Sequence, residues 1–353
     1  KKKYFYPILK NTKKLIAVDN NISIKKYTTF GVPVLAKYFA QFANLQQLKE
    51  LLLHSEMKSE KLLILGGGSN LLFTQNFDGL VLKNNIKGIT VEKETREHIF
   101  VKSGAGENWH EFVLYCVNNN FAGVENLSLI PGNVGASPMQ NIGAYGTEIK
   151  DVFHSLEAFE IETGKLITFD NEACKFGYRE SIFKNSHKGK YIITSVTFKL
   201  TKKPIFNISY GAIESELEAM NIEKLSIEAI SNAVINIRTR KLPNPSEIGN
   251  AGSFFKNPVI SKAHFDALLQ KYPAIAHYKL PANQFKIAAG WMIDQLGWKG
   301  KRIEDYGVHK NQALVLVNYG ESSGKDIYDL STEIIKSVEE NFQISLEREV
   351  NII

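Results

Sequence analysis

The sequence predicts an α+β protein with a glycine-rich first half and a smaller C-terminal domain. Three observations support this prediction. First, 12 of the 25 glycines lie between residues 66 and 146, which is typical of short strands joined by glycine turns. Second, the apolar residues that follow keep strand and helix periodicities in separate segments. Third, a chain of 353 residues with 44% apolar content is long enough for two or three packed domains.

The predicted elements follow from these patterns in chain order. Apolar runs bounded by glycine predict strands, and an apolar face behind the polar residues Asn108 and Glu111 predicts a helix. Pro243 and Pro245 stop a second helix, near which we place a domain boundary. Ser322 and Ser323 are suitable caps for the last helix. The strands are expected at 62–65, 79–82, 98–101, 155–161, 191–200 and 313–318, and the helices at 109–118, 226–239, 288–295 and 322–341.

Charge and cysteine content exclude several classes of function. Residues 1–26 contain eight lysines and one aspartate, so the net charge of +6 leaves −1 for the rest of the chain. A basic arm on a near-neutral body favours a solvated arm and predicts no nucleic-acid partner. No apolar run approaches the roughly 18 residues of a membrane span. Cys116 and Cys174 have no metal-ligand or disulfide spacing, which predicts no metal site and fits a reducing cytoplasm.

The most informative segment is residues 131–146 (PGNVGASPMQNIGAYG), which we call the glycine loop. Four glycines and two prolines in sixteen positions are too many for a helix or a central strand. Glycine lets backbone N–H groups approach a ligand closely, and such groups hold a pyrophosphate without any lysine. The loop therefore predicts an anion-binding site.

A second segment, residues 66–70 (GGGSN), is the glycine turn. Its spacing matches neither G-x-G-x-x-G nor Walker A, and on its own it is more often a tight strand connection. Together with residues 104–108 (GAGEN) and the glycine loop, it predicts a bound dinucleotide. At Gly67 we expect close backbone approach and a positive φ, both of which a β-branched side chain would disturb.

Three further residues are candidates for chemistry. Arg179 is flanked by aromatic residues and is either an anion clamp or a surface arginine packed on Tyr178. Ser253 lies between small residues and two phenylalanines. It does not fit G-x-S-x-G and has no adjacent histidine, so it is a poor nucleophile but could protonate a carbanion or enolate. Glu349 shares one face of a predicted terminal strand with Glu347, which is alternatively a solvated face.

These segments, in this order, resemble the UDP-N-acetylenolpyruvoylglucosamine reductases from about Tyr27 to Val350. The resemblance rests on GGGSN, GAGENWHE, the glycine loop, GYRES, RKLPNP, GNAGSFFKNP and KIAAGWMIDQ. It implies a two-subdomain FAD-binding module of the vanillyl-alcohol-oxidase (PCMH) type, followed by an α+β substrate-binding domain. The expected divisions are 1–88 for the arm and first subdomain, 89–228 for the second subdomain, and 229–353 for the C-terminal domain.

The resemblance also implies the activity. NADPH reduces noncovalent FAD and leaves, and UDP-N-acetylglucosamine enolpyruvate then takes its place. Hydride from flavin N5 reaches the vinyl CH₂ carbon, and a serine protonates the adjacent carbon, which gives UDP-N-acetylmuramate for peptidoglycan synthesis. The resemblance implies a cytoplasmic monomer without metal.

Carried onto this sequence, the resemblance assigns three sets of residues. The proton donor is Ser253, with Arg179 and Glu349 beside the substrate carboxylate. We infer that Glu349 is protonated or bridged by Arg179 during turnover, because an ionised carboxylate would repel the substrate. FAD is expected at Gly66, Gly67, Gly68, Ser69, Asn70, Gly132, Gly135, Ser137, Asn141 and Gly143. The substrate is expected at Tyr210, Lys241, Asn257, Gln284 and Lys286.

Two other classes of protein remain as alternatives. An FAD oxidase of the same superfamily would share residues 66–146 but has no reason to contain GNAGSFFKNP or Glu349. A non-catalytic nucleotide-binding module would need no set of Arg179, Ser253 and Glu349.

Overall fold

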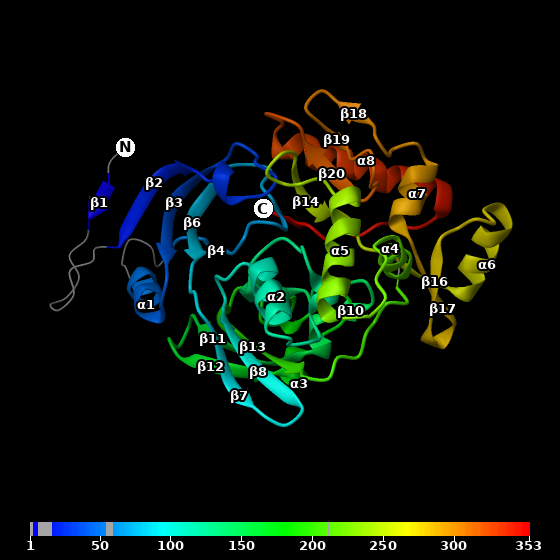
Figure 1. Cartoon of the computed structure of the whole chain (residues 1–353). Helices are drawn as coiled ribbons and strands as arrows, with labels where there is room; N and C mark the ends of the chain where they lie inside the picture. Colours follow the sequence, from blue (N-terminus) through cyan, green and yellow to red (C-terminus); the bar gives the residue numbers. More distant parts are fainter. Residues whose placement is uncertain (1–2, 6–15, 54–58, 211) are drawn as a thin grey trace. The chain divides into compact units, whose positions relative to one another are not determined.

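The computed structural model describes residues 3–5, 16–53, 59–210 and 212–353 (Figure 1). Most of the lysine-rich arm, and Gly211 next to Tyr210, therefore lie outside the described residues. The chain forms two compact units that are discontinuous in sequence. Unit 1 contains Lys1–Ile22, Leu35–Gly68 and Phe77–Arg238, and unit 2 contains Ser23–Val34, Ser69–Asn76 and Thr239–Ile353.

The first sheet of unit 1 has the strand order β1-β2-β3-β6-β4. β3 and β4 both pair in parallel with β6, whereas β1 pairs antiparallel with β2. Helix α1 (Leu45–Leu53) buries Leu48 and Leu51 in the same core as Leu80 and Leu82 of β6. The strands are β1 (Lys3–Phe5), β2 (Ala17–Ser23), β3 (Leu35–Phe42), β4 (Leu62–Leu65) and β6 (Phe77–Asn84).

The second sheet of unit 1 is antiparallel, with the order β12-β11-β13-β8-β7. Helix α2 (Trp109–Asn118) packs on it through Trp109 and Phe112, whose ring centroids lie 5.7 Å and 4.8 Å from that of Phe198. The Asn108 side chain caps α2 by accepting from the Glu111 amide. The strands are β7 (Ile89–Glu94), β8 (His98–Gly104), β11 (Phe153–Glu160), β12 (Leu166–Asp170) and β13 (Tyr191–Thr201).

Short elements and two helices complete unit 1. Helices α4 (Ile213–Ala219) and α5 (Ile227–Lys241) share an apolar cluster that includes Ile213, Ile230 and Val234. The remaining elements are β9 (Gly143–Ala144), β10 (Thr147–Glu148), α3 (Asn171–Cys174), and 3₁₀ turns at Glu125–Leu127, Val134–Met139, Ile149–Asp151 and Ile182–Lys184.

Unit 2 is built on a sheet with the order β14-β20-β19-β18 and a three-stranded sheet β15-β17-β16. Two segments from the first half of the chain are bound to the C-terminal part of unit 2 through their backbones. Asn250 N–H donates to Thr29 O (3.0 Å), and β5 (Leu71–Leu72) pairs with β21 (Asn351–Ile352). The other elements are β14 (Gly249–Ser253), β15 (Val259–Ser261), α6 (Lys262–Lys271), β16 (His277–Leu280), β17 (Gln284–Ile287), α7 (Ala289–Gln295), β18 (Arg302–Ile303), β19 (Tyr306–Val308), β20 (Val315–Asn318), α8 (Gly324–Phe342), and 3₁₀ turns at Lys25–Tyr27 and Pro281–Asn283.

The structure confirms the predicted α+β architecture, the four predicted helices and the six strands expected between residues 62 and 318, with bounds that shift by a few residues. The terminal strand expected over 346–350 is not confirmed. Helix α5 runs to Lys241, further than expected. The elements that were not predicted are the helices α1, α3, α4 and α6 and the strands β1–β3, β5, β7, β9, β10, β12, β14–β19 and β21. No helix among the described residues is long and apolar enough to cross a membrane.

Candidate functional site

The glycine turn and the glycine loop touch in unit 1. A Cβ atom on Gly67 would lie 2.7 Å from Gly132 Cα and 2.9 Å from the Asn133 side chain, so only glycine fits. The expected positive φ at Gly67 is wrong, because the positive φ angles are found at Gly68 (64°) and Gly132 (117°). Close approach of two backbones is therefore what requires glycine at position 67.

Four backbone N–H groups at this contact are available to a ligand. Within the described residues, the amides of Gly66, Gly67, Gly132 and Asn133 donate to no protein acceptor, and all four residues are half-buried. By contrast, the neighbouring amide of Val134 donates to Glu107 O (2.8 Å). Backbone amides without a protein acceptor on adjacent glycine-rich segments can bind an anion, so this contact fits the pyrophosphate of FAD.

A lysine that the sequence did not indicate supports the glycine turn. Lys83 of β6 donates from Nζ to Gly66 O (2.9 Å), and burial lowers the pKa of its ammonium group. The interaction fixes the direction of the Gly66–Gly67 peptide. A strand residue gives no local signal for such a contact. Because Lys83 binds a carbonyl oxygen of the protein, binding of the pyrophosphate by backbone amides without a lysine stays a prediction.

Other predicted cofactor residues form hydrogen bonds or close contacts that stabilise the glycine loop. Ser137 is buried and its hydroxyl donates to Val134 O (2.7 Å). Asn141 is fully buried, and its amide donates to Glu148 Oε2 and Gly177 O, both at 2.9 Å. A Cβ atom on Gly135 would lie 2.5 Å from the Ala105 Cβ. These hydrogen bonds and close contacts are internal to the protein.

Arg179 lies against the end of the glycine loop. Its Nη2 donates to Gly143 O (2.7 Å), and its guanidinium lies 5.2 Å from the centroid of the Tyr178 ring. The packing on Tyr178 and a position at the glycine loop therefore occur together. Arg179 has a φ of 56°, a left-handed conformation that is uncommon for a residue with a side chain and often occurs at functional sites.

Ser253 ends β14 directly after a β-bulge. Asn250 pairs with Val317 of β20, and Ser253 pairs with Val315. Two residues of β14 therefore lie between these pairs but only one residue of β20, so β14 has one extra residue. Gly252 has a φ of 69°, which permits the bulge. Bulges often re-aim side chains next to active sites, and Ser253 is the first paired residue after this one.

The residue that follows Ser253 is hydrogen-bonded to the backbone of Glu349 in unit 2. The Glu349 N–H donates to Phe254 O (2.8 Å), and the Asn70 side chain donates to Glu349 O (3.2 Å). Asn70 O in turn accepts from Asn351 N (3.1 Å). The predicted terminal strand over 346–350 is reduced to a single bridge between Phe255 and Arg348, because regular pairing begins only at β21. Arg179 belongs to unit 1.

The predicted substrate residues are placed as follows. Tyr210 is 39% exposed, and Lys241 is exposed at the last position of α5. Asn257 Oδ1 accepts from the Ala289 amide (2.9 Å) at the start of α7. Gln284 and Lys286 share one face of β17, opposite its buried residues.

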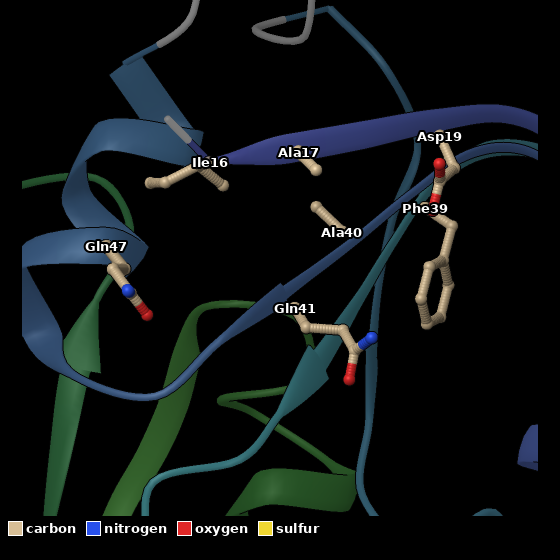
Figure 2. A pocket seen from close by; sticks show the side chains of 7 residues that line it. All are labelled: Ile16, Ala17, Asp19, Phe39, Ala40, Gln41 and Gln47. Carbon is tan, nitrogen blue, oxygen red and sulfur yellow. The ribbon is translucent and has the colours of Figure 1, made fainter. Parts of the chain in front are cut away.

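A cavity of about 270 Å³ lies between β2, β3 and the beginning of α1 (Figure 2). Its lining combines apolar residues with the side chains of Asp19, Gln41 and Gln47 and includes no predicted site residue. We assign it no role in the chemistry. No group of three or more potential metal ligands occurs in the described part of the chain.

Comparison with known proteins identifies both halves of the chain. Residues 36–170 match the family model of the FAD binding domain, and residues 244–353 match the C-terminal domain of UDP-N-acetylenolpyruvoylglucosamine reductase. The chain is 52% identical over 337 residues to the UDP-N-acetylenolpyruvoylglucosamine reductase of Flavobacterium johnsoniae, which covers 95% of this chain and 99% of that protein.

Two further relatives agree. The UDP-N-acetylenolpyruvoylglucosamine reductase of Amoebophilus asiaticus is also 52% identical, with coverage of 95% and 99%. The crystal structure of the enzyme from Thermus caldophilus has the same fold, with a TM-score of 0.66 at 23% identity over 96% of this chain and 99% of that one. The chain, whose glycine turn and glycine loop lie in contact, belongs to the UDP-N-acetylenolpyruvoylglucosamine reductase family.

Proposed function

We propose that this protein reduces UDP-N-acetylglucosamine enolpyruvate to UDP-N-acetylmuramate, with FAD as cofactor and NADPH as reductant. The observation that carries the proposal is the contact of the glycine turn and the glycine loop, whose four amides fit a pyrophosphate in a chain of this family. Bound FAD supplies the hydride chemistry, because it accepts two electrons from a nicotinamide and passes them to the enolpyruvyl double bond.

Arg179 has the chemistry to stabilise the charge of the reaction. Hydride addition to the vinyl CH₂ carbon moves negative charge onto the substrate carboxylate. A planar guanidinium holds such a charge with two parallel hydrogen bonds, and the bond to Gly143 O fixes the orientation of this one.

Ser253 supplies the proton. Its O–H bond breaks as a C–H bond forms at the carbon next to the reduced CH₂, so hydride and proton together saturate the double bond. The serine oxygen then regains a proton from water. The bulge at Gly252 and the bond from Glu349 N to Phe254 O hold this segment in place. Glu349 acts beside the substrate carboxylate, either protonated or bridged by Arg179.

The substrate diphosphate is bound by residues remote from the reacting carbons. We assign Tyr210, Lys241 and Asn257 to this role, and Gln284 and Lys286 as weaker contributors. Exposed Lys241 supplies a positive charge, whereas Asn257 Oδ1 is engaged with Ala289. We propose a division of the chain at 1–88, 89–228 and 229–353, and a monomer located in the cytoplasm, which agrees with two buried free cysteines.

One experiment tests the function. Purified protein loaded with FAD is mixed anaerobically with NADPH and then with UDP-N-acetylglucosamine enolpyruvate, while the flavin absorbance is followed. We expect NADPH to bleach the flavin and the enolpyruvyl substrate to restore it. A protein that ignores NADPH but turns over an alcohol or sugar with O₂ would be an oxidase, and one that takes up no FAD would be neither enzyme.

A further inference from the structure

A half-buried arginine outside the predicted site contacts both ends of the glycine loop. Arg238, on α5, donates from Nε to Leu129 O (3.2 Å) and forms a side-chain hydrogen bond with Tyr145. Leu129 precedes the glycine loop by two residues, and Tyr145 is its penultimate residue. The guanidinium of Arg238 therefore joins the two stems of the loop.

Both partners of Arg238 have unusual backbone conformations. Leu129 has a φ of 58° and Tyr145 a φ of 49°, in the left-handed region that side chains disfavour. Leu129 is further held through its amide, which donates to His110 Nδ1 (3.0 Å), and Tyr145 O accepts from the Asn126 side chain (3.1 Å). Such conformations persist only where the surroundings fix them, and they are common at ligand-binding sites.

The helix that carries Arg238 is fixed against the same segment. The hydroxyl groups of Ser128 and Ser231 are 2.8 Å apart, and both residues are buried. Ser231 lies two turns before Arg238 on α5, so the helix cannot move away from the start of the loop without breaking this bond. The guanidinium is consequently held in a defined place.

The charge of Arg238 has no carboxylate partner within the described residues. A guanidinium has five N–H donors, and a carbonyl and a phenol hydroxyl satisfy only part of them. Burial lowers the pKa of Arg238, and the side chain is half-buried, so water screens its charge only in part. A partly desolvated charge without a counter-ion is unfavourable, and a bound anion reduces that cost.

We propose that Arg238 binds an anionic group of the bound FAD, and that this contact holds the glycine loop in its ligand-binding conformation. The proposal rests on the function proposed above. A guanidinium binds a delocalised negative charge that presents two neighbouring acceptor atoms, and two parts of FAD offer this arrangement. They are the pyrophosphate and the N1–C2=O edge of the reduced flavin ring.

The test compares Arg238→Gln and Arg238→Lys with the control Arg240→Gln, an exposed arginine two residues later on the same helix. Apoprotein is prepared from each, and the dissociation constants for FAD and for riboflavin are measured by flavin fluorescence. Thermal unfolding of each apoprotein with and without FAD, and the two-electron reduction potential of the bound flavin, are measured in parallel.

We expect Arg238→Gln to weaken FAD binding by about 10- to 100-fold, the range of a charge-assisted hydrogen bond. Arg238→Lys should recover part of the affinity, since it keeps the charge without the planar fork. Arg240→Gln should resemble the wild type. If the pyrophosphate is the partner, the loss affects FAD and not riboflavin. If the ring is the partner, both weaken and the reduction potential falls, by about 30 mV for each tenfold by which the reduced flavin loses more affinity than the oxidised flavin.

A structural arginine would give a different result. Wild-type affinity for FAD and an unchanged potential in Arg238→Gln, with a lower unfolding temperature of the apoprotein, would overturn the proposal. Wild-type apoprotein that binds no FAD would instead contradict the proposed function itself. If Arg238→Gln does not fold, Arg238→Lys decides the matter, because a ligand contact predicts weaker FAD binding from a folded protein.

Discussion

At the scale of single residues, Gly67 is the sharpest test of the cofactor site. Gly67→Val should lose most of its FAD, because any side chain collides with the Gly132 backbone. Gly66→Ala is the matched comparison: its Cβ would lie 3.7 Å from the Asn133 Cβ, an ordinary contact, so it should lose less FAD than Gly67→Ala. FAD content after gel filtration measures both. A yellow, fully loaded Gly67→Val protein would refute the placement.

His110 gives a pH-dependent prediction. Burial lowers the pKa of His110 below its ordinary value of 6.5, and the nearby charge of Arg238 acts in the same direction. The unfolded chain therefore binds a proton more readily, so the stabilising contribution is complete above about pH 6.5 and is lost as the pH falls below it. His110→Asn keeps an acceptor for the Leu129 amide but does not titrate.

We expect the free energy of unfolding to decrease less between pH 7 and pH 5 in His110→Asn than in the wild type. Urea titrations at several pH values measure this difference. His309 also has a pKa lowered by burial, so part of the pH dependence should remain in the variant. Equal slopes in the two proteins would show that His110 is not buried in its neutral form.

At the scale of elements, the N-terminus of α8 offers a test that leaves the site alone. Ser323 and Asp326 form a capping box, in which each side chain accepts from the backbone amide of the other residue. Ser323→Ala should reduce the free energy of unfolding by about 1 kcal/mol, with unchanged FAD content. Urea unfolding measures the loss. No loss of stability would mean that water satisfies the exposed amides equally well.

Elements with a local signal were predicted from the sequence. Helix α2 has an apolar face and the cap Asn108, and helix α5 ends near two prolines, so both were found with nearly correct bounds. The β16–β17 hairpin was missed, since its Gln284–Ile287 strand is short and carries polar residues on one face. Alternation over four residues is too weak a pattern to separate such a strand from a loop.

Only part of the candidate site could be predicted, because only some of its residues have a local sequence signal. The glycine turn and the glycine loop can be recognised from their composition, but their contact at Gly67 depends on tertiary packing. The anchoring of Glu349 by Asn70 joins residues 279 positions apart, and no local pattern contains it. Lys83 and Arg238 also lie in ordinary strand and helix sequences, so only the structure reveals their contacts with Gly66 and Leu129.

At the scale of the whole molecule, substrate binding and chemistry should separate. If Lys241 holds the nucleotide diphosphate, far from the reacting carbons, Lys241→Ala should raise KM for the UDP-sugar about tenfold or more and lower kcat less. Lys336→Ala, which removes an exposed lysine from α8, is the control. Steady-state kinetics measure both constants. An unchanged KM with a collapsed kcat would contradict the assigned role.

The central claim is that one flavin serves two half-reactions, of which only the second needs the proton of Ser253. Anaerobic stopped-flow absorbance of Ser253→Ala tests this claim most directly. We predict that NADPH bleaches the flavin at nearly the wild-type rate, whereas reoxidation by the enolpyruvyl substrate slows by about 10²- to 10⁴-fold, the range for a positioned general acid. Ser253→Cys should recover part of the rate, because a thiol also donates a proton. Reoxidation of Ser253→Ala at nearly the wild-type rate, or equal slowing of both half-reactions, would contradict the account.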